Sequence, residues 1–183
     1  MPKLITDPDA FPRIFSTATS SAFRLEVRRA YGVTEEDEPF RRFLAGEDPG
    51  IDWFRPWLDL VRETTGRGVR VERVRVIDEP PSDYLRFEIA MTPENLAAGE
   101  DIRYLTRREA HDLGLPPVDY WLVDAKRLYV LHFSEDDRFL GLEEVKDQGL
   151  INEYGMHRIR AWTRTTPFTR GAPIGDRAHG LSS

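Results

Sequence analysis

Cysteine is missing from this chain of 183 residues. Its absence excludes a disulfide framework, a thiolate zinc site and a thiol nucleophile, and it is compatible with a reducing cytoplasm. No apolar run approaches the roughly 20 residues that a membrane-spanning helix needs. The first residues also lack the apolar core of a secretion signal. We therefore expect a cytoplasmic protein.

Positive charge is also in short supply. The chain carries 26 Lys and Arg against 32 Asp and Glu, so its formal net charge is −6. Binding to nucleic acid backbones or anionic membranes needs a surplus of cations facing the phosphates. We therefore expect no direct nucleic acid partner and no membrane partner. Most of the cations are arginines, whose planar guanidinium suits pairing with carboxylates.

Metal-ligating and phosphate-binding patterns are equally scarce. None of the four histidines, at positions 111, 132, 157 and 179, has a second histidine at i+4, and H-E-x-x-H does not occur. Walker loops, G-x-G-x-x-G and the nucleophile elbow G-x-S-x-G do not occur either. We therefore expect no metal, no cofactor and no catalytic residues.

What remains is the composition of a folded globular domain, 40% apolar and 32% charged. We expect a single domain over residues 1–168, followed by a flexible tail over residues 169–183 that is rich in Gly, Pro, Ser and Arg. Helical or alternating spacing of apolar residues distinguishes helices from strands. The expected helices cover residues 9–20, 53–65, 84–98, 107–113 and 147–165, and the expected strands cover 22–27, 69–77, 101–106, 120–123, 128–133 and 139–142.

The order of these elements indicates an α/β fold. Two helices end at glycine just before a strand, at Gly66–Gly68 and at Gly99, and this step favours parallel pairing. Residues 124–127 form a hairpin that adds antiparallel strands. We predict a mixed sheet of five to six strands with helices on both faces, while a mixed α+β arrangement stays open. Residues 22–27 alternate apolar and charged, so we expect that strand to have one wet face.

The densest polar cluster is Ser82-Asp83-Tyr84-Leu85-Arg86-Phe87-Glu88, after a strand end and two prolines. Open α/β sheets bind ligands outside the carboxyl ends of their strands. Asp83, Tyr84, Arg86 and Glu88 are therefore candidate ligand-binding residues, with Arg86 holding an anion. The competing interpretation is a helix cap with surface ion pairs. If the segment is a strand, Tyr84, Arg86 and Glu88 share one face.

A second candidate group is spread along the chain. Arg24 and Glu26 share one face of the first expected strand, and Arg103 lies on another strand. If these strands are neighbours, Arg24, Arg103, Glu26 and Glu88 can form a partly buried ionic network. Such a network either marks a polar pocket or sets strand register, and both interpretations stay open. We include Arg24 and Arg103 among the candidate ligand-binding residues.

Several stretches resemble one actinobacterial family, a domain of unknown function that is often encoded beside helix-turn-helix regulators. The resemblance covers roughly residues 11 to 168 and implies no established activity. It rests on residues 23–26, 31–33, 40–46, 82–88, 99–103 and 161–162, the last before Pro167-Phe168.

The element order also looks like one half of a phospholipase D-type domain. The catalytic form of that family carries H-x-K-x4-D at this hairpin, and the matching positions here are Pro117, Asp119 and Asp124. The histidine nucleophile and the lysine are therefore missing, so the resemblance implies a degenerate copy without the family's chemistry.

These observations lead to two functional hypotheses. The first is a non-catalytic regulatory or partner-binding domain that acts with a helix-turn-helix transcriptional regulator or binds a small anionic ligand in an arginine-lined crevice. The alternative is an enzyme on phosphoesters or nucleotides, with Asp83, Arg86 and Arg103 in its site. An open pocket that gathers these three residues favours the enzyme.

Overall fold

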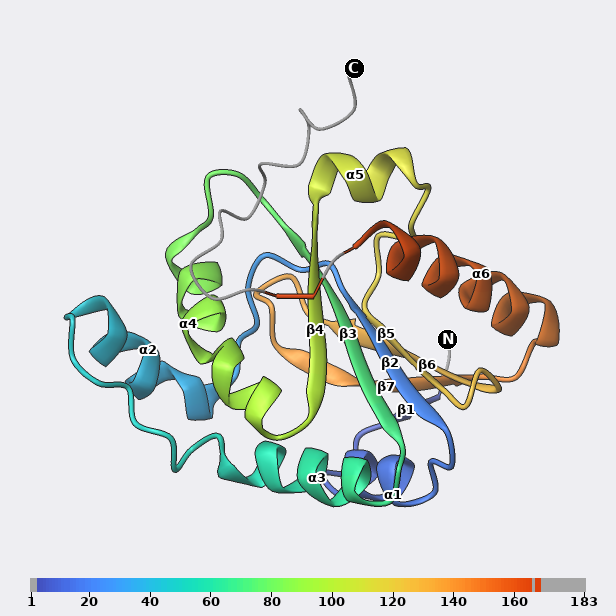
Figure 1. Ribbon diagram of the computed structural model, residues 1–183, viewed down its shortest axis with the longest axis horizontal. Helices are drawn as coiled ribbons and strands as arrows, with labels where there is room; N and C mark the ends of the chain where they lie inside the picture. The colour runs from blue at the N-terminus through green and yellow to red at the C-terminus, as the bar shows by residue number, and fades with distance from the viewer. Residues whose placement is uncertain (1–2, 166, 169–183) are drawn as a thin grey trace.

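The computed structural model describes residues 3–165, 167 and 168 of the chain (Figure 1). The strands are β1 (Leu4–Ile5), β2 (Ser21–Glu26), β3 (Arg70–Ile77), β4 (Glu100–Thr106), β5 (Tyr120–Val123), β6 (Arg127–Phe133) and β7 (Phe139–Val145). The helices are α1 (Ala10–Ser16), the 3-10 helix η1 (Thr34–Glu36), α2 (Asp37–Leu44), α3 (Arg55–Gly66), α4 (Asp83–Ala97), α5 (Arg107–Asp112) and α6 (Gln148–Arg164).

All seven strands form one mixed sheet in the order β1-β7-β6-β5-β2-β3-β4. β2, β3 and β4 run parallel, and β5 to β7 and β1 add antiparallel strands on the other side of β2. The predicted α/β class is confirmed. The sheet has one strand more than expected because β1, only two residues long, pairs with β7. A two-residue strand leaves no periodic pattern in the sequence.

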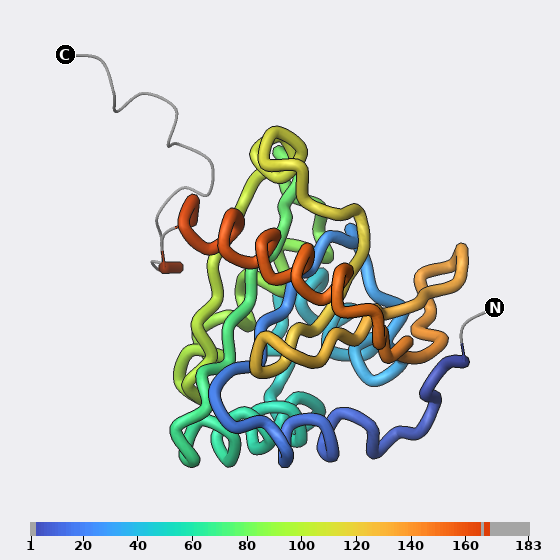
Figure 2. The backbone as a smooth tube through the Cα atoms, turned by 90° about the vertical axis from the view of Figure 1, so that its right-hand side faces the viewer, coloured from blue at the N-terminus to red at the C-terminus, as the bar shows by residue number. Residues whose placement is uncertain are grey.

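Helices cover both faces of the sheet, as predicted. Figure 2 shows α6 on one side of the strands and α1 and α3 on the other. One face, here named the α4 face, carries Ala22, Arg24 and Glu26 of β2 and packs against α1, α3 and α4. The opposite α6 face carries Phe23 and Leu25 and packs against α5 and α6. Alternation along each strand therefore decides which side chains meet.

The central position of β2 corrects one expectation. Every residue of β2 is buried, so the expected wet face does not exist. β5 and β3 flank β2, and helices cover both faces of these strands. The charged residues of β2 and the seven buried residues of β3 therefore lie inside the protein, where charges must be paired.

Residues 82–88 start helix α4, which answers the question that the sequence left open. The hydroxyl of Ser82 caps the helix by accepting a hydrogen bond from the backbone N–H of Leu85 at 3.1 Å. The helix continues past Pro93 to Ala97. The expected tail over residues 169–183 lies outside the described residues.

Candidate functional site

Arg24, Glu26 and Glu88 meet on the α4 face, where they join four further charged residues. We name this group, together with Glu36, the buried charge cluster. Its members are Arg24, Glu26, Glu36, Arg73, Arg75, Glu88, Glu100 and Asp119. Glu26 is the last residue of β2, so the cluster reaches the carboxyl end of a parallel strand, a common ligand position in open α/β sheets.

Glu26 is the centre of the cluster. Its carboxylate accepts hydrogen bonds from Arg75 Nε at 2.7 Å and from Arg73 Nη1 at 3.0 Å, and Arg24 Nη2 lies 3.6 Å away. Burial by itself would raise the pKa of Glu26. The positive charges of Arg73, Arg75 and Arg24 outweigh that effect and lower the pKa far below its ordinary value. Glu26 is therefore ionised at neutral pH.

Asp119 completes the cluster on the side of β5. Arg24 Nη2 donates to its carboxylate at 2.8 Å, and the backbone N–H of Val27 donates at 2.9 Å. The hydroxyl of Tyr31 donates to the same carboxylate. Asp119 is the hydrogen-bond acceptor in each of these contacts, so its carboxylate positions Arg24 and the end of β2.

Glu100 completes the cluster on the side of β4. Its carboxylate accepts from Arg73 Nε at 2.7 Å, from the side-chain amide of Asn95 at 2.7 Å and from the indole N–H of Trp57 at 3.3 Å. Asn95 belongs to α4 and Trp57 to α3. The contacts of Glu100 thus tie two helices to the edge strand.

Glu88 is held less completely than the other carboxylates. Arg75 Nη2 lies 3.2 Å from its carboxyl group, and no described residue donates a hydrogen bond to that group. Burial raises the pKa of Glu88 to about 8, because Arg75 offsets only part of the desolvation cost and Glu26 and Glu36 repel a further negative charge. Glu88 is therefore mostly protonated at neutral pH.

Glu36, from η1, faces the same end of the cluster. The hydroxyl of Tyr84 donates a hydrogen bond to its carboxylate. Burial raises the pKa of Glu36, and the bond from Tyr84 offsets part of this rise. The pKa of Tyr84 is also raised, first by burial and then by Glu88 and Glu36, so the phenol stays neutral.

The predicted segment 82–88 divides between surface and interior. Asp83 and Arg86 form an ion pair at 3.3 Å, with 64% and 62% of their side chains exposed. This matches the competing interpretation of a cap with surface pairs, and Arg86 takes no part in the cluster. Tyr84 and Glu88 point inward, as one face of a helix allows.

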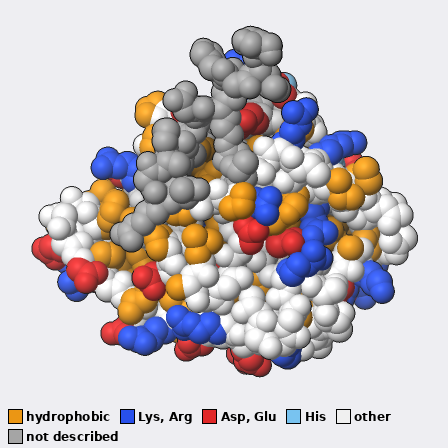
Figure 3. All heavy atoms as spheres, in the orientation of Figure 1, with side chains coloured by type: hydrophobic (Ala, Val, Ile, Leu, Met, Phe, Trp, Pro, Cys, Tyr) orange, Lys and Arg blue, Asp and Glu red, His pale blue; other side chains and the backbone are white. Residues whose placement is uncertain are grey.

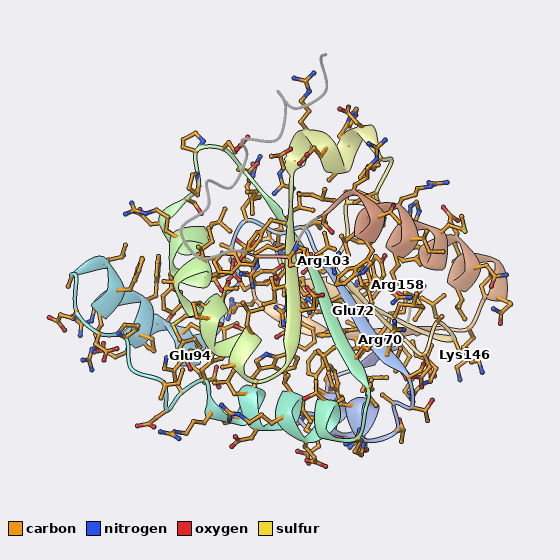
Figure 4. All side chains as sticks on the ribbon, viewed as in Figure 1. Arg70, Glu72, Glu94, Arg103, Lys146 and Arg158 are labelled. Atoms are coloured by element: carbon orange, nitrogen blue, oxygen red, sulfur yellow. The ribbon has the colours of Figure 1, made fainter. Side chains whose placement is uncertain are left out.

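Arg103 lies on the other side of the sheet. Its guanidinium pairs with Asp101 at 2.9 Å and lies 3.7 Å from the ring centre of Trp162 in α6. Figure 4 labels it with Glu72 and Arg158, and Figure 3 shows basic and acidic side chains gathered there. The expected network of Arg24, Glu26, Glu88 and Arg103 is therefore correct for three residues and wrong for Arg103.

Sequence reasoning missed Arg73, Arg75, Glu36, Glu100 and Asp119 as members of the site; Asp119 was named only as a position of the phospholipase D-type pattern. A signal for the two arginines was present, since Arg73 and Arg75 are two residues apart in one strand, as Arg24 and Glu26 are. The parallel register pairs Arg24 with Arg73 and Glu26 with Arg75. The sequence does not specify this register, so it gives no means of matching the two pairs.

Asp124, the surviving position of the phospholipase D-type pattern, holds the chain in place. Its carboxylate accepts hydrogen bonds from the backbone N–H groups of Thr19, Ser20 and Ser21 at 2.7 to 3.1 Å. Burial would raise the pKa of Asp124, but these backbone donors lower it below its ordinary value. Asp124 therefore fixes the start of β2.

The described part of the chain holds neither a membrane-spanning helix nor a cluster of metal ligands. No helix among them is both long and apolar enough to cross a membrane. Among the same residues, no group of three or more His, Cys, Asp or Glu side chains is placed to hold a metal ion.

A family model described as "Domain of unknown function (DUF6879)" matches residues 9–170, so the chain belongs to this family. No curated protein matches the chain. One solved structure that matches is titled "Structure of TrmBL2, an archaeal chromatin protein, shows a novel mode of DNA binding", with 9% sequence identity and a TM-score of 0.47. The match covers 85% of this chain, which spans about half (49%) of the TrmBL2 chain.

This likeness corrects the expectation about partners. We excluded direct contact with nucleic acid from the net charge alone, and the similarity to a protein described as binding DNA contradicts that exclusion. The net charge is a property of the whole chain and does not show where the charges lie. Arg70, Arg103 and Arg158 lie on the α6 side (Figure 4), where each pairs with a carboxylate of Glu72 or Asp101.

Proposed function

We propose that this protein is a non-catalytic regulatory domain of the cytoplasm that binds a ligand or a partner protein and acts with a helix-turn-helix transcriptional regulator. The observation that carries the proposal is the buried charge cluster. Charged residues buried at the carboxyl end of a parallel strand, with raised pKa values at Glu36 and Glu88, are typical of a binding site.

The positions that resemble a phospholipase D-type half domain support a role without catalysis. Pro117 has no nucleophilic or acidic side chain. Asp119 and Asp124 use their carboxylates to accept hydrogen bonds from Arg24 and from backbone N–H groups. Groups engaged in this way hold the fold and are not free to attack a substrate. The degenerate phospholipase-like layout and the actinobacterial gene neighbourhood remain premises of this proposal.

The enzyme hypothesis needs Asp83, Arg86 and Arg103 around one pocket. Asp83 and Arg86 pair with each other in solvent, whereas Arg103 pairs with Asp101 beside α6. Nothing in this arrangement gathers a substrate phosphate. We therefore do not extend the proposal to phosphoester or nucleotide chemistry.

The arginines of the cluster argue against the expected anionic ligand. Arg24, Arg73 and Arg75 each contact at least two carboxyl groups at 2.7 to 3.6 Å. A second anion would have to displace these carboxylates. The carboxyl groups that the arginines do not neutralise are therefore a better guide to the ligand class than the arginines are.

The test is co-expression with a helix-turn-helix regulator from the genomic neighbourhood, followed by size-exclusion chromatography with light scattering. We expect one stoichiometric complex, and no hydrolysis of bis(p-nitrophenyl) phosphate above the buffer rate. Separate elution of the two proteins would refute the partner. Hydrolysis that disappears in Asp119→Asn or Asp124→Asn would refute the non-catalytic role.

A further inference from the structure

We infer that the end of the buried charge cluster at Glu36 and Glu88 binds a small organic ammonium ion that carries a hydrogen-bond acceptor. The inference rests on the proposed binding function and names the ligand class of its site. Three independent features support it: the charge balance, two unsatisfied polar groups and the surrounding aromatic rings.

The charge balance of the cluster leaves room for a cation. Three guanidinium groups face five carboxyl groups. Glu26, Glu100 and Asp119 each accept a close hydrogen bond from an arginine and so use all three positive charges. Among the described residues, Glu36 has only the neutral phenol of Tyr84 as a hydrogen-bond partner, and Glu88 shares an arginine with Glu26. A bound cation would supply positive charge at this end of the cluster and so stabilise the ionised forms of Glu36 and Glu88.

Two polar groups at this end have unused bonding capacity. No described residue donates a hydrogen bond to the carboxyl group of Glu88, whose side chain is 15% exposed. Arg75 is 6% exposed, and its Nη1 has no acceptor among the described residues. Unsatisfied buried groups are costly. A ligand with both an N–H donor and an acceptor atom would satisfy both groups.

Aromatic rings surround the same place. The rings of Tyr31 and Tyr84 lie 6.3 Å apart between centres, and those of Phe40 and Tyr84 lie 5.5 Å apart. The face of an aromatic ring attracts an organic cation. Carboxylates combined with aromatic rings therefore favour an ammonium group over an anion.

A metal ion fits the site poorly. Hard divalent cations need several oxygen ligands at short range, and no such group exists among the described residues. The guanidinium of Arg75 beside Glu88 would also repel a compact divalent charge. An ammonium group has a single charge and directional N–H donors, so it can donate to the carboxyl group of Glu88, which lacks a hydrogen-bond donor among the described residues.

We expect a ligand to reach the site through movement of the segment formed by η1 and α2. Pro39 is the only buried residue of α2, and Phe40 and Phe43 contact Phe87 of α4 with ring centres 5.5 and 5.6 Å apart. Figure 1 shows α2 on the far side of α4 from the strands. A segment with so few buried contacts opens at low cost in free energy, which gives a ligand a path to Glu36 and Glu88.

The experiment titrates the full chain with ethanolammonium chloride, which has an ammonium group and a hydroxyl acceptor. Sodium chloride at equal ionic strength and sodium acetate serve as controls. Binding is followed by calorimetry and by carboxyl 13C NMR of labelled glutamate at pH 7. We expect saturable binding, and a shift of the Glu88 carboxyl signal toward its ionised position.

The variants separate this site from general charge effects. Glu88→Gln and Glu36→Gln should each weaken ethanolammonium binding by roughly tenfold or more, because each removes a carboxyl group that is ionised in the bound state. Glu94→Gln changes an exposed carboxylate of the same helix and should leave binding unchanged (Figure 4). Circular dichroism confirms that each variant is folded, and Glu36→Gln serves as the second variant if Glu88→Gln unfolds.

Three outcomes would overturn the inference: no saturation by ethanolammonium at millimolar concentrations, equal weakening in Glu94→Gln, or saturable binding of acetate in its place. The complex with the regulator is measured on the same preparation. If that complex forms while ethanolammonium does not bind, the ligand class is wrong and the regulatory function stands.

Discussion

Replacing Glu26 by glutamine is the sharpest test of the buried charge cluster. The substitution keeps the side-chain shape but removes the negative charge that faces Arg73, Arg75 and Arg24 at 3.0, 2.7 and 3.6 Å. Removing one partner of a buried ion pair typically costs about 3–5 kcal/mol, because the other charge stays buried without compensation. We expect Glu26→Gln to lower the free energy of unfolding by about 3–5 kcal/mol.

A neighbouring group should soften this loss. The charge of Glu26 is one of the causes that raise the pKa of Glu88, after burial. Once Glu26 is neutral, Glu88 can ionise beside Arg75 and restore part of the balance. The double variant Glu26→Gln/Glu88→Gln should therefore lose more stability than the two single losses added together, with a coupling of about 0.5–3 kcal/mol.

Urea unfolding at pH 7, followed by circular dichroism and tryptophan fluorescence, measures these differences by linear extrapolation. Glu94→Gln, in solvent on α4, is the matched control and should unfold like the native protein. A loss below about 1 kcal/mol for Glu26→Gln would refute the reasoning, since it would place that carboxylate in an environment as tolerant as the surface. Additive losses in the double variant would refute the link to Glu88.

Three further predictions concern single positions. The pKa of Glu88 is raised to about 8, so its contribution to stability is fully present below its unfolded pKa and is lost as pH rises toward 8. The urea midpoint should therefore fall less between about pH 5 and 8.5 in Glu88→Gln than in the native protein. Equal pH dependence of the two midpoints would refute this. Asp124→Asn should cost about 1–3 kcal/mol, because the amide replaces an acceptor of the backbone N–H groups of residues 19–21; an unchanged urea midpoint would contradict this. Gly99→Ala should cost about 1–3 kcal/mol, since φ is +102° there and a Cβ would lie 2.8 Å from Thr65 Oγ1; a stable Gly99→Ala protein would show that this approach is not tight.

Local patterns predicted the elements well, because each depends on residues close in sequence. The α/β class followed from the helix–glycine–strand steps, and β3 was recognised from its alternation despite the charges at Arg73 and Arg75. The expected wet face of β2 failed for a physical reason. Alternation of charged and apolar residues shows that two faces differ, but whether the charged face meets water or a second layer depends on the order of strands in the sheet.

Only part of the site was predicted, because the register between neighbouring strands decides which residues belong to the buried charge cluster. Arg24 and Glu26 were placed on one face from the period of two, and that face turned out to be the α4 face. Across the sheet, Arg73 pairs with Ile102 of β4, so Ile102 and not Arg103 lies on that face. A shift of one residue in the register would have reversed this outcome. The spacing of residues within one strand does not show which residues of the neighbouring strand lie on the same face.

The buried charge cluster is difficult to explain as a stabilising core alone. Hydrophobic residues of similar volume in place of a buried ionic group are often neutral or stabilising, because they avoid the desolvation of the charges. Parallel strands covered on both faces are ordinarily rich in Val, Ile and Leu, and β3 instead carries Glu72, Arg73 and Arg75 as buried residues. A cluster built only to fix strand register would balance its charges. This cluster ends in Glu36 and Glu88, two carboxyl groups more than its three arginines could neutralise if both were ionised, and that surplus of carboxyl groups is what connects its structure to binding.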